Sequence, residues 1–184
     1  MANLILNGST SGSVTLSSPA VSGTTTLTLP TQSGTVITTG STFAGTGPAF
    51  SAYLNTSQSI TTSTFTKVQI NTEEFDTNSN YDNATNYRFT PTVAGYYQVN
   101  GRFSSEVNST LLVATIYKNG VEVKRGMDTR ASVNVSTAVT VNTLIYMNGT
   151  TDYIEFYAYI TGTSPIIESG QKLAWFQASM VRSA

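Results

Sequence analysis

Apolar and polar residues alternate in short runs from about residue 48 to the end of the chain, with Gly, Asn and Pro between the runs. Alternation with a period of two is typical of strands, and no segment has the 3.6-residue period of an amphipathic helix. Many short strands separated by regular turns indicate a sandwich or jelly roll. We therefore expect an all-β domain over residues 46–184, with strands at 49–54, 66–71, 87–90, 95–104, 111–118, 121–124, 133–147, 153–161 and 172–181.

The run at 153–160 is apolar on both of its faces. Tyrosines occupy one set of alternate positions, and Ile or Phe occupies the other. A strand that is apolar on both faces is buried on both. Because the opposite layer of a sandwich covers only one face, this strand predicts a second cover, such as a neighbouring subunit.

Two Asn-Gly pairs mark turns in this domain. Asn119–Gly120 lies between two apolar runs, and Asn148–Gly149 follows the long run at 133–147. Asn-Gly favours a two-residue hairpin turn, because both residues adopt positive φ readily. We expect a β-hairpin at each pair.

The first 45 residues have a different texture, with a repeat of eleven residues. Ser-Gly recurs at Ser11–Gly12, Ser22–Gly23 and Ser33–Gly34, and each glycine is followed by a short alternating run. A few short strands are marginally stable alone, but three chains wound together can bury one apolar face of each. The repeat therefore predicts a stem of short β-strands over residues 1–45, and a flexible, β-prone linker is the alternative.

Composition and charge exclude several classes of function. Only 10% of the 184 residues are charged, the net charge is −1 and the first charged side chain is Lys67. No basic stripe is present to neutralise phosphates, so we expect no nucleic-acid partner. No apolar run is long enough to span a bilayer, so we expect no membrane insertion, and the N-terminus lacks the charged and apolar regions of a signal peptide.

Candidate catalytic chemistry is sparse. The chain has no His and no Cys, which excludes His-based triads and ordinary zinc sites. Carboxylates gather at Glu73, Glu74 and Asp76, and a glycosidase needs two carboxylates placed in a cleft. A solvated loop explains this cluster better, so we expect no enzyme activity and no cofactor.

Residues 76–82 resemble a calcium-binding loop in one respect. Oxygen-bearing side chains alternate at Asp76, Asn78, Asn80 and Asp82. Tyr81 stands at the sixth position, where an EF-hand loop needs glycine, and no Glu stands at the twelfth. We expect no metal here, although these four residues are the chain's candidate ligands.

The domain over residues 48–182 resembles the C1q-like domain of the C1q/tumour-necrosis-factor superfamily. Its motifs are an opening strand at 48–52, the series Tyr81-Asp82, Phe89, Pro91, Gly95 and Tyr97, a central hairpin at 116–120 and a last strand at 173–178. The resemblance implies a ten-stranded jelly roll that forms a homotrimer around an apolar axis. Together with the doubly apolar run, it suggests the following residues as trimer-interface candidates: Tyr153, Phe156, Tyr157, Tyr159, Trp175 and Phe176.

The segment before this domain departs from the animal members of the family, which carry a collagen stalk. Glycine is too sparse for collagen here, and the Ser-Gly units are similar to segments of bacteriophage fibre proteins. We expect a bacteriophage virion protein, namely a homotrimeric fibre that attaches to other virion proteins through residues 1–45. The head would contact the host surface, where tyrosines and asparagines in the loops at 81–87 and 127–134 are candidates to bind a glycan; packing at the rim of the domain is the alternative for these residues. A capsid decoration protein with a purely structural role is the alternative, followed by an enzyme that acts on surface glycan.

Overall fold

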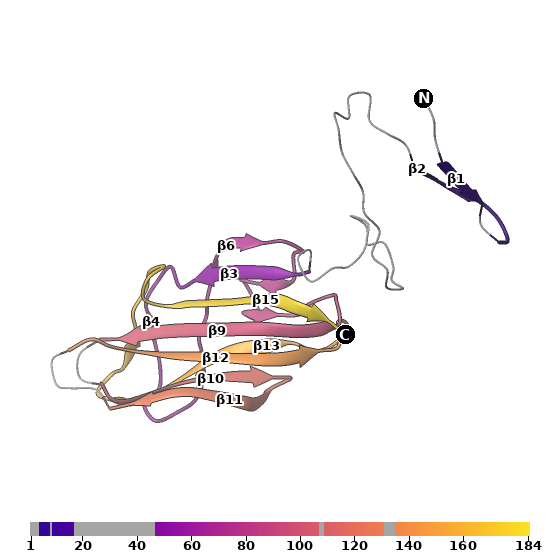
Figure 1. Ribbon diagram of the computed structural model, residues 1–184. Helices are drawn as coiled ribbons and strands as arrows, with labels where there is room; N and C mark the ends of the chain where they lie inside the picture. The colour runs from indigo at the N-terminus through magenta and orange to yellow at the C-terminus, as the bar shows by residue number, and fades with distance from the viewer. Residues whose placement is uncertain (1–3, 8, 17–46, 107–108, 131–134) are drawn as a thin grey trace, which may run out of the picture. The chain divides into compact units, whose positions relative to one another are not determined.

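The computed structural model describes residues 4–7, 9–16, 47–106, 109–130 and 135–184 (Figure 1). The chain divides into two compact units, residues 1–37 and 38–184. In the first unit, β1 (Leu4–Asn7) pairs with β2 (Ser13–Leu16) as an antiparallel hairpin. The rest of the predicted repeat and the predicted boundary at residue 45 lie outside the described residues.

The second unit, which we call the head, is a sandwich of two antiparallel sheets (Figure 1). The first sheet has the order β6–β3–β15–β9–β12, and the short β14 and β4 continue from one end of β9. Its strands are β3 (Ala49–Tyr53), β4 (Gln58–Ser59), β6 (Thr72–Asp76), β9 (Gly95–Ser105), β12 (Thr137–Met147), β14 (Ile166–Ile167) and β15 (Trp175–Ser183).

The second sheet has the order β11–β10–β13–β8–β7, with β5 also paired to β13. Its strands are β5 (Thr66–Lys67), β7 (Tyr81–Asp82), β8 (Arg88–Phe89), β10 (Ser109–Lys118), β11 (Val121–Thr129) and β13 (Ile154–Gly162). No helix able to cross a bilayer occurs among the residues described above.

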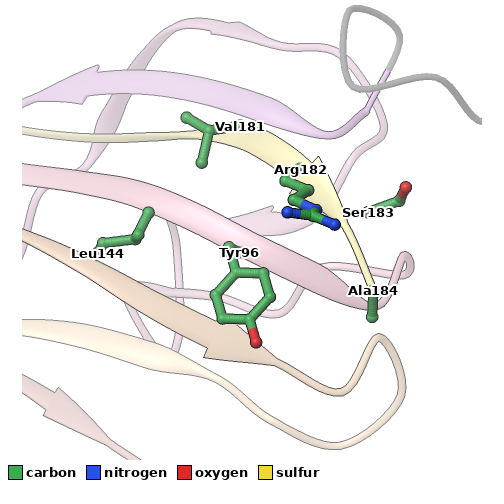
Figure 2. Close-up of a pocket in the computed structure, with 6 residues that line it drawn as sticks. All are labelled: Tyr96, Leu144, Val181, Arg182, Ser183 and Ala184. Carbon is green, nitrogen blue, oxygen red and sulfur yellow. The ribbon is translucent and has the colours of Figure 1, made fainter.

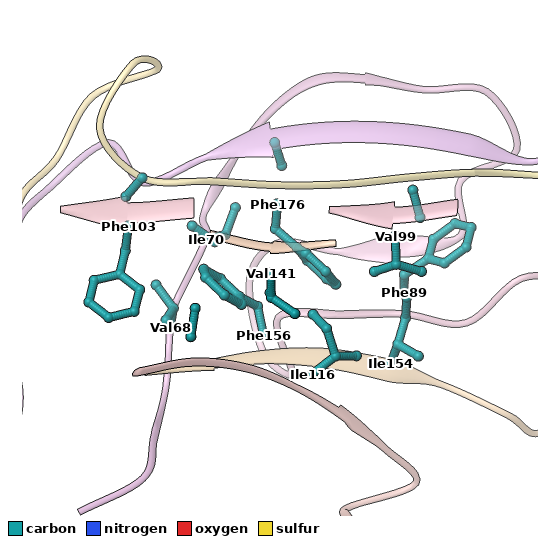
Figure 3. Close-up of a cluster of buried hydrophobic side chains, with 14 of the residues drawn as sticks. Val68, Ile70, Phe89, Val99, Phe103, Ile116, Val141, Ile154, Phe156 and Phe176 are labelled. Carbon is teal, nitrogen blue, oxygen red and sulfur yellow. The ribbon is translucent and has the colours of Figure 1, made fainter. Parts of the chain in front are cut away.

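Alternate side chains of both sheets meet in one aromatic core, part of which Figure 3 shows. The rings of Phe50 and Phe89 stack with centroids 4.6 Å apart, and those of Phe156 and Phe176 with centroids 5.7 Å apart. Aligned sheets that interdigitate their inner side chains in this way make a β-sandwich. The prediction of an all-β jelly-roll head is confirmed.

One of the two Asn-Gly predictions is confirmed and the other is wrong. Asn119 and Gly120 have φ values of 53° and 79°, and they join β10 to β11 in a hairpin. The strands flanking Asn148–Gly149 instead lie in different sheets, since β12 pairs with β9 and β13 pairs with β10. The side-chain oxygen of Asn148 accepts three backbone N–H bonds from residues 150–152, and this capped loop carries the chain from one sheet to the other.

The chain enters and leaves the head at the same end, which we call the proximal end. The backbone N–H of Met180 donates to the carbonyl of Pro48 at 3.1 Å, and that of Ala184 donates to Ala94 at 3.1 Å. Figure 1 shows β3 starting and β15 finishing at this end. The opposite, distal end includes the described loops at 54–57, 163–165 and 168–174.

Candidate functional site

One side of the first sheet covers the core, and the other side, which we call the open face, has no covering layer among the described residues of the head. Along β9, even-numbered residues point to the open face while Tyr97, Val99 and Phe103 are fully buried. The register of β12 against β9 places Leu144 opposite Gln98 and Tyr146 opposite Tyr96. Directly opposed residues of an antiparallel pair share a face. The open face is therefore built from parallel rows of side chains that cross β12, β9, β15 and β3.

The proximal rows of the open face carry an apolar cluster, consisting of Tyr96, Leu144, Tyr146 and Val181. These side chains are 43%, 53%, 42% and 47% exposed, respectively, and the rings of Tyr96 and Tyr146 lie 5.5 Å apart. Figure 2 shows Tyr96, Leu144 and Val181 around a shallow hollow of about 650 Å³ that ends at the C-terminal residue Ala184. Large apolar side chains that share one exposed surface mark an interaction site.

The middle of the open face carries a row of amides. Asn142 lies opposite Asn100, and Gln177 lies between Asn100 and Ser51. The Gln98 Nε2 donates to Asn100 Oδ1 at 3.1 Å within the same strand. We call Asn142, Asn100 and Gln177 the amide row.

The distal part of the open face holds Trp175, which lies between Arg102 and Tyr53. The Arg102 guanidinium donates to the carbonyls of Lys172 and Leu173, so its charge ties down the β14–β15 loop. The register also places Arg182 opposite Tyr96, so the proximal row carries one charge and the distal row carries Arg102. The rows between them, at positions 98 and 100 of β9, 142 and 144 of β12 and 177 and 179 of β15, carry no charged residue. The centre of this face therefore presents aliphatic, aromatic and amide groups with almost no charge.

The outer face of the second sheet has the opposite chemistry. Lys67 and Glu155 form an ion pair there, and Arg125 Nε lies 2.8 Å from Glu122 Oε1. This bonding to Arg125 lowers the pKa of the Glu122 carboxyl. A subunit interface is usually depleted of charged groups at its centre, so this face is the poorer candidate for one.

Aromatic residues on this outer face cover one another. The Tyr117 and Tyr157 rings stack with centroids 4.0 Å apart at 22°, and Phe65 packs on Tyr159 at 4.9 Å. The Arg125 guanidinium lies 5.2 Å above the Phe65 ring. Burial raises the pKa of the Tyr157 phenol to about 12, with a further contribution from the charge of Glu155.

The run at 153–160 was expected to need a neighbouring subunit, because a sandwich covers only one of its two apolar faces. These contacts show that the head covers much of the second face itself. The even-numbered side chains of β13 fill the core, and the head's own residues partly cover the tyrosines on the other side. Among the predicted interface residues, Phe156 and Phe176 are 0% exposed within one subunit and have no surface to offer a second one. Trp175 does lie on the open face, while Tyr153 is covered by the Arg88 guanidinium at 4.5 Å.

The sequence analysis missed the four residues of the apolar cluster. The available signal was Leu144 and Tyr146, which stand at the outward positions of a run whose inward positions are also apolar. Residues 153–160 are also apolar at both inward and outward positions, but there the head itself covers both faces of the strand. The strand that keeps an uncovered apolar side is β12, and not β13.

The four candidate calcium ligands belong to two separate turns. The Asp76 carboxylate accepts backbone N–H bonds from Asn78 and Tyr81 at 3.2 and 2.7 Å. The Asp82 carboxylate accepts backbone N–H bonds from residues 84–86, and these bonds lower its pKa to about 2. No group of three or more acidic side chains able to hold a metal is found among the described residues. Both carboxylates therefore act as turn caps.

The carboxylates of Glu73 and Glu74 lie on the exposed edge strand β6. Partial desolvation and the nearby Asp76 raise the pKa of Glu73. Glu74 Oε2 accepts a 2.6 Å bond from the hydroxyl of Ser51. Glu74 therefore acts as a hydrogen-bond acceptor that links the edge strand β6 to β3.

The two loops predicted to bind a glycan lie at opposite ends of the head. Tyr81 is buried at the proximal side, where its hydroxyl donates to the Ile70 carbonyl at 2.8 Å and its ring stacks on Phe50. The second loop follows β11 at the distal end, and residues 131–134 lie outside the described residues. Tyr81 therefore has no free ring face to offer a glycan, and the site in the second loop stays a prediction.

Three comparisons place the fold among known structures. No protein-family model matches the chain, and no curated protein matches its sequence. The globular domain of zebrafish complement 1qA is similar in structure, with a TM-score of 0.56 at 19% identity, covering 74% of this chain and 99% of the zebrafish domain. Eiger TNF from S. frugiperda reaches a TM-score of 0.60 at 6% identity (75% of this chain, 95% of that one), and murine APRIL reaches 0.58 at 7% identity (73% and 98%).

These similar structures are complement and tumour-necrosis-factor-type domains, and not enzymes. The region of similarity covers 95–99% of each of these structures and 73–75% of this chain, a share that corresponds in length to the head. At this level of identity it establishes the fold alone. The head of this protein is a C1q/TNF-like jelly roll whose open sheet face carries the candidate interface.

Proposed function

We propose that the chain is a structural protein of a bacteriophage particle: a fibre in which three copies join through the open face, residues 1–45 attach to the particle and the distal loops contact the host surface. The observation that carries this proposal is the open face, which holds an apolar cluster and whose middle rows carry no charge, with Arg182 and Arg102 in the rows on either side. A surface of this kind is costly to leave in water and suits contact with another copy.

A second copy is the best occupant for the open face. The C1q-like domains that the sequence resembles form trimers, and the head has the same fold. Burial of apolar surface contributes about 25 cal/mol per Å², so four large side chains left about half exposed represent several kcal/mol on association. The two charges of the face lie outside its middle rows: the Arg102 guanidinium is bound to two carbonyls of its own loop, and Arg182 is exposed at the proximal end.

The position of the chain ends supports a fibre. The described part of the head begins at the proximal end, so the distal loops lie at the end opposite the connection to the preceding residues. The distal loops include exposed polar side chains, among them Asn55, Thr56, Ser57, Gln171 and Lys172. Three copies of a weak surface site on one rigid body raise avidity without any new contact.

Solution mass tests the assembly. Light scattering should give about three times 19.6 kDa for the full chain, and residues 46–184 should also be trimeric. A monomeric full chain at micromolar concentration would refute the assembly, and the fibre proposal with it.

Binding to virions tests the role of residues 1–45. Head protein without these residues should remain trimeric but should no longer attach to particles that lack the native protein. Attachment that survives the truncation would refute the anchor assignment. Immunogold labelling at the tail supports a host-contacting fibre, and labelling spread over the capsid would refute it in favour of capsid decoration.

A further inference from the structure

The amide row lies across the middle of the open face, between the apolar cluster and the Arg102 row. Asn100 is at the centre of the eleven-residue strand β9, with Asn142 of β12 on one side and Gln177 of β15 on the other. Purely apolar residues here would have extended the cluster up the sheet. Three amides in register at this point therefore need an explanation if the face is an interface.

The direction of the chain fixes how these rows are arranged in an assembly. If three copies join one stem, all three proximal ends point the same way, so the three-fold axis follows the strands. Each row of side chains across the sheet then becomes one layer perpendicular to the axis. The apolar cluster with Arg182 forms a proximal layer, the amides form a middle layer, and Trp175 forms a distal layer beside Arg102, whose guanidinium is bound to its own subunit's loop.

Equivalent residues of the three copies meet near such an axis, so each side chain there must interact favourably with the same side chain of the other two copies. An amide both donates and accepts hydrogen bonds, and it can pair with an identical amide. A carboxylate or an ammonium group cannot do this without a counter-ion. Buried amides are also costly unless they are paired, so they favour the one register in which they meet.

We propose that Asn100, Asn142 and Gln177 form a buried amide layer around the three-fold axis, which sets the register and the number of subunits in the trimer. This inference rests on the proposed trimer and adds the residues that make the assembly specific. The apolar cluster supplies most of the affinity, and the amide layer penalises assemblies in which the three faces are shifted along the axis.

The test introduces one charge per subunit with little change of shape. In Gln177→Glu, three carboxylates meet in the middle layer at pH 8, and the dissociation constant of the trimer should rise at least about a hundredfold. At pH 4 much of the glutamate is protonated and again donates and accepts, so most of this loss should be recovered. Two charged groups lie near this row: Arg102, which is bound to the carbonyls of Lys172 and Leu173, and Glu74, whose Oε2 accepts a bond from Ser51, the residue opposite Gln177. Asn142→Asp, on the other side of the row, should therefore give the same pH dependence away from Glu74.

The matched control is Gln69→Glu, the same change at an exposed position outside the sheets. It should shift the dissociation constant less than about twofold at either pH. Both variants should be made in the full chain, and circular dichroism should show the wild-type spectrum. If Gln177→Glu does not fold, Asn142→Asp makes the same test from β12.

The outcomes separate this inference from the proposed function. The amide layer is supported if the wild-type protein is a trimer and Gln177→Glu dissociates at pH 8 and reassembles at pH 4. A wild-type trimer with a charged variant that stays trimeric at pH 8 refutes the layer and leaves the trimer intact. A monomeric wild-type protein refutes both.

Discussion

The stacked pair Tyr117–Tyr157 gives the sharpest test of which sheet face holds the subunits together. If the outer face of the second sheet is covered by the head itself, truncating either ring should destabilise the fold and leave the assembly unchanged. Complete burial of an aromatic ring makes truncation to alanine cost about 3–5 kcal/mol. Both rings are only part-buried, so we expect about 2 kcal/mol for Tyr117→Ala and about 2 kcal/mol for Tyr157→Ala.

The stacking geometry sets the coupling between the two changes. Rings with centroids 4.0 Å apart and an angle of 22° are worth about 0.5–1.5 kcal/mol beyond their burial. Because this coupling is lost only once, the double variant should lose about 3 kcal/mol instead of about 4 kcal/mol. In a head of this size, each single variant should lower the melting temperature by about 6–8 °C.

The assay combines denaturant unfolding of the head, at one fixed protein concentration, with light scattering of the native protein. Tyr146→Ala is the matched control, since it makes the same truncation on the open face. It should weaken the trimer and leave the stability of a single subunit nearly unchanged. If Tyr157→Ala lowers the mass to one subunit without loss of subunit stability, the outer face is the interface and our assignment of the open face is wrong.

Three further predictions follow from single contacts. Leu144→Asp places a charge in the apolar cluster, so light scattering should give the mass of one subunit with a change in its unfolding free energy below about 0.5 kcal/mol; a persistent trimer would contradict the interface. Gly101→Ala adds a methyl group 2.8 Å from the Phe156 ring, and thermal unfolding should show a loss of about 1–3 kcal/mol, so an unchanged melting temperature would contradict the packing. The folded-state pKa of Asp82 is depressed to about 2 from an ordinary value of 3.8, so its stabilising effect is full above pH 4 and is lost as the pH falls through about 2. Asp82→Asn should remove that part of the pH dependence in melts between pH 2 and 5, and identical profiles would refute the cap.

The long strands of the head were predictable because each carries enough alternating residues to define its own faces. The runs at 95–104, 111–118 and 153–161 correspond to β9, β10 and β13 with small shifts at their ends. The two-residue strands β4 and β14 were missed, because they exist only through their pairing with each other and with the end of β9. Such pairing is decided by the tertiary structure and leaves no local pattern.

The edge strands were harder to predict. The run at 121–124 gave only the first half of β11, which continues to Thr129 through a charged stretch with irregular register. The run at 66–71 ended where β6 begins at Thr72, since Glu73 and Glu74 break the apolar alternation. Edge strands carry charge and bulges that prevent further pairing, and these features hide them from a search for alternating residues.

The run at 153–160 suggested a subunit contact for a related reason, and burial rules out Phe156 and Phe176 among the candidates. A run that is apolar on both faces indicates that both faces of the strand are covered, but it does not indicate which residues pack on the second face. For β13 the cover is Phe65, from a loop, and Tyr117, from the neighbouring strand; their proximity to the run appears only once the chain is folded. Hydrophobicity alone therefore cannot separate a side covered within the subunit from a side left for a partner.

Charge gives the better criterion. A face that remains in water in a chain with few charged residues still collects most of them, as the Lys67–Glu155 and Glu122–Arg125 pairs do on the second sheet. The open face has the same access to solvent in one subunit, yet its middle rows carry no charged residue, and its two charges are Arg182 in the proximal row and Arg102, bound to backbone carbonyls, in the distal row. Exposed apolar side chains identify a surface whose burial against a partner is favourable. The scarcity of charged groups in the middle of this surface indicates a contact that excludes water. Both conditions are met on the strands β9, β12 and β15, and the amides in the middle of that surface are what turns a favourable contact into a specific one.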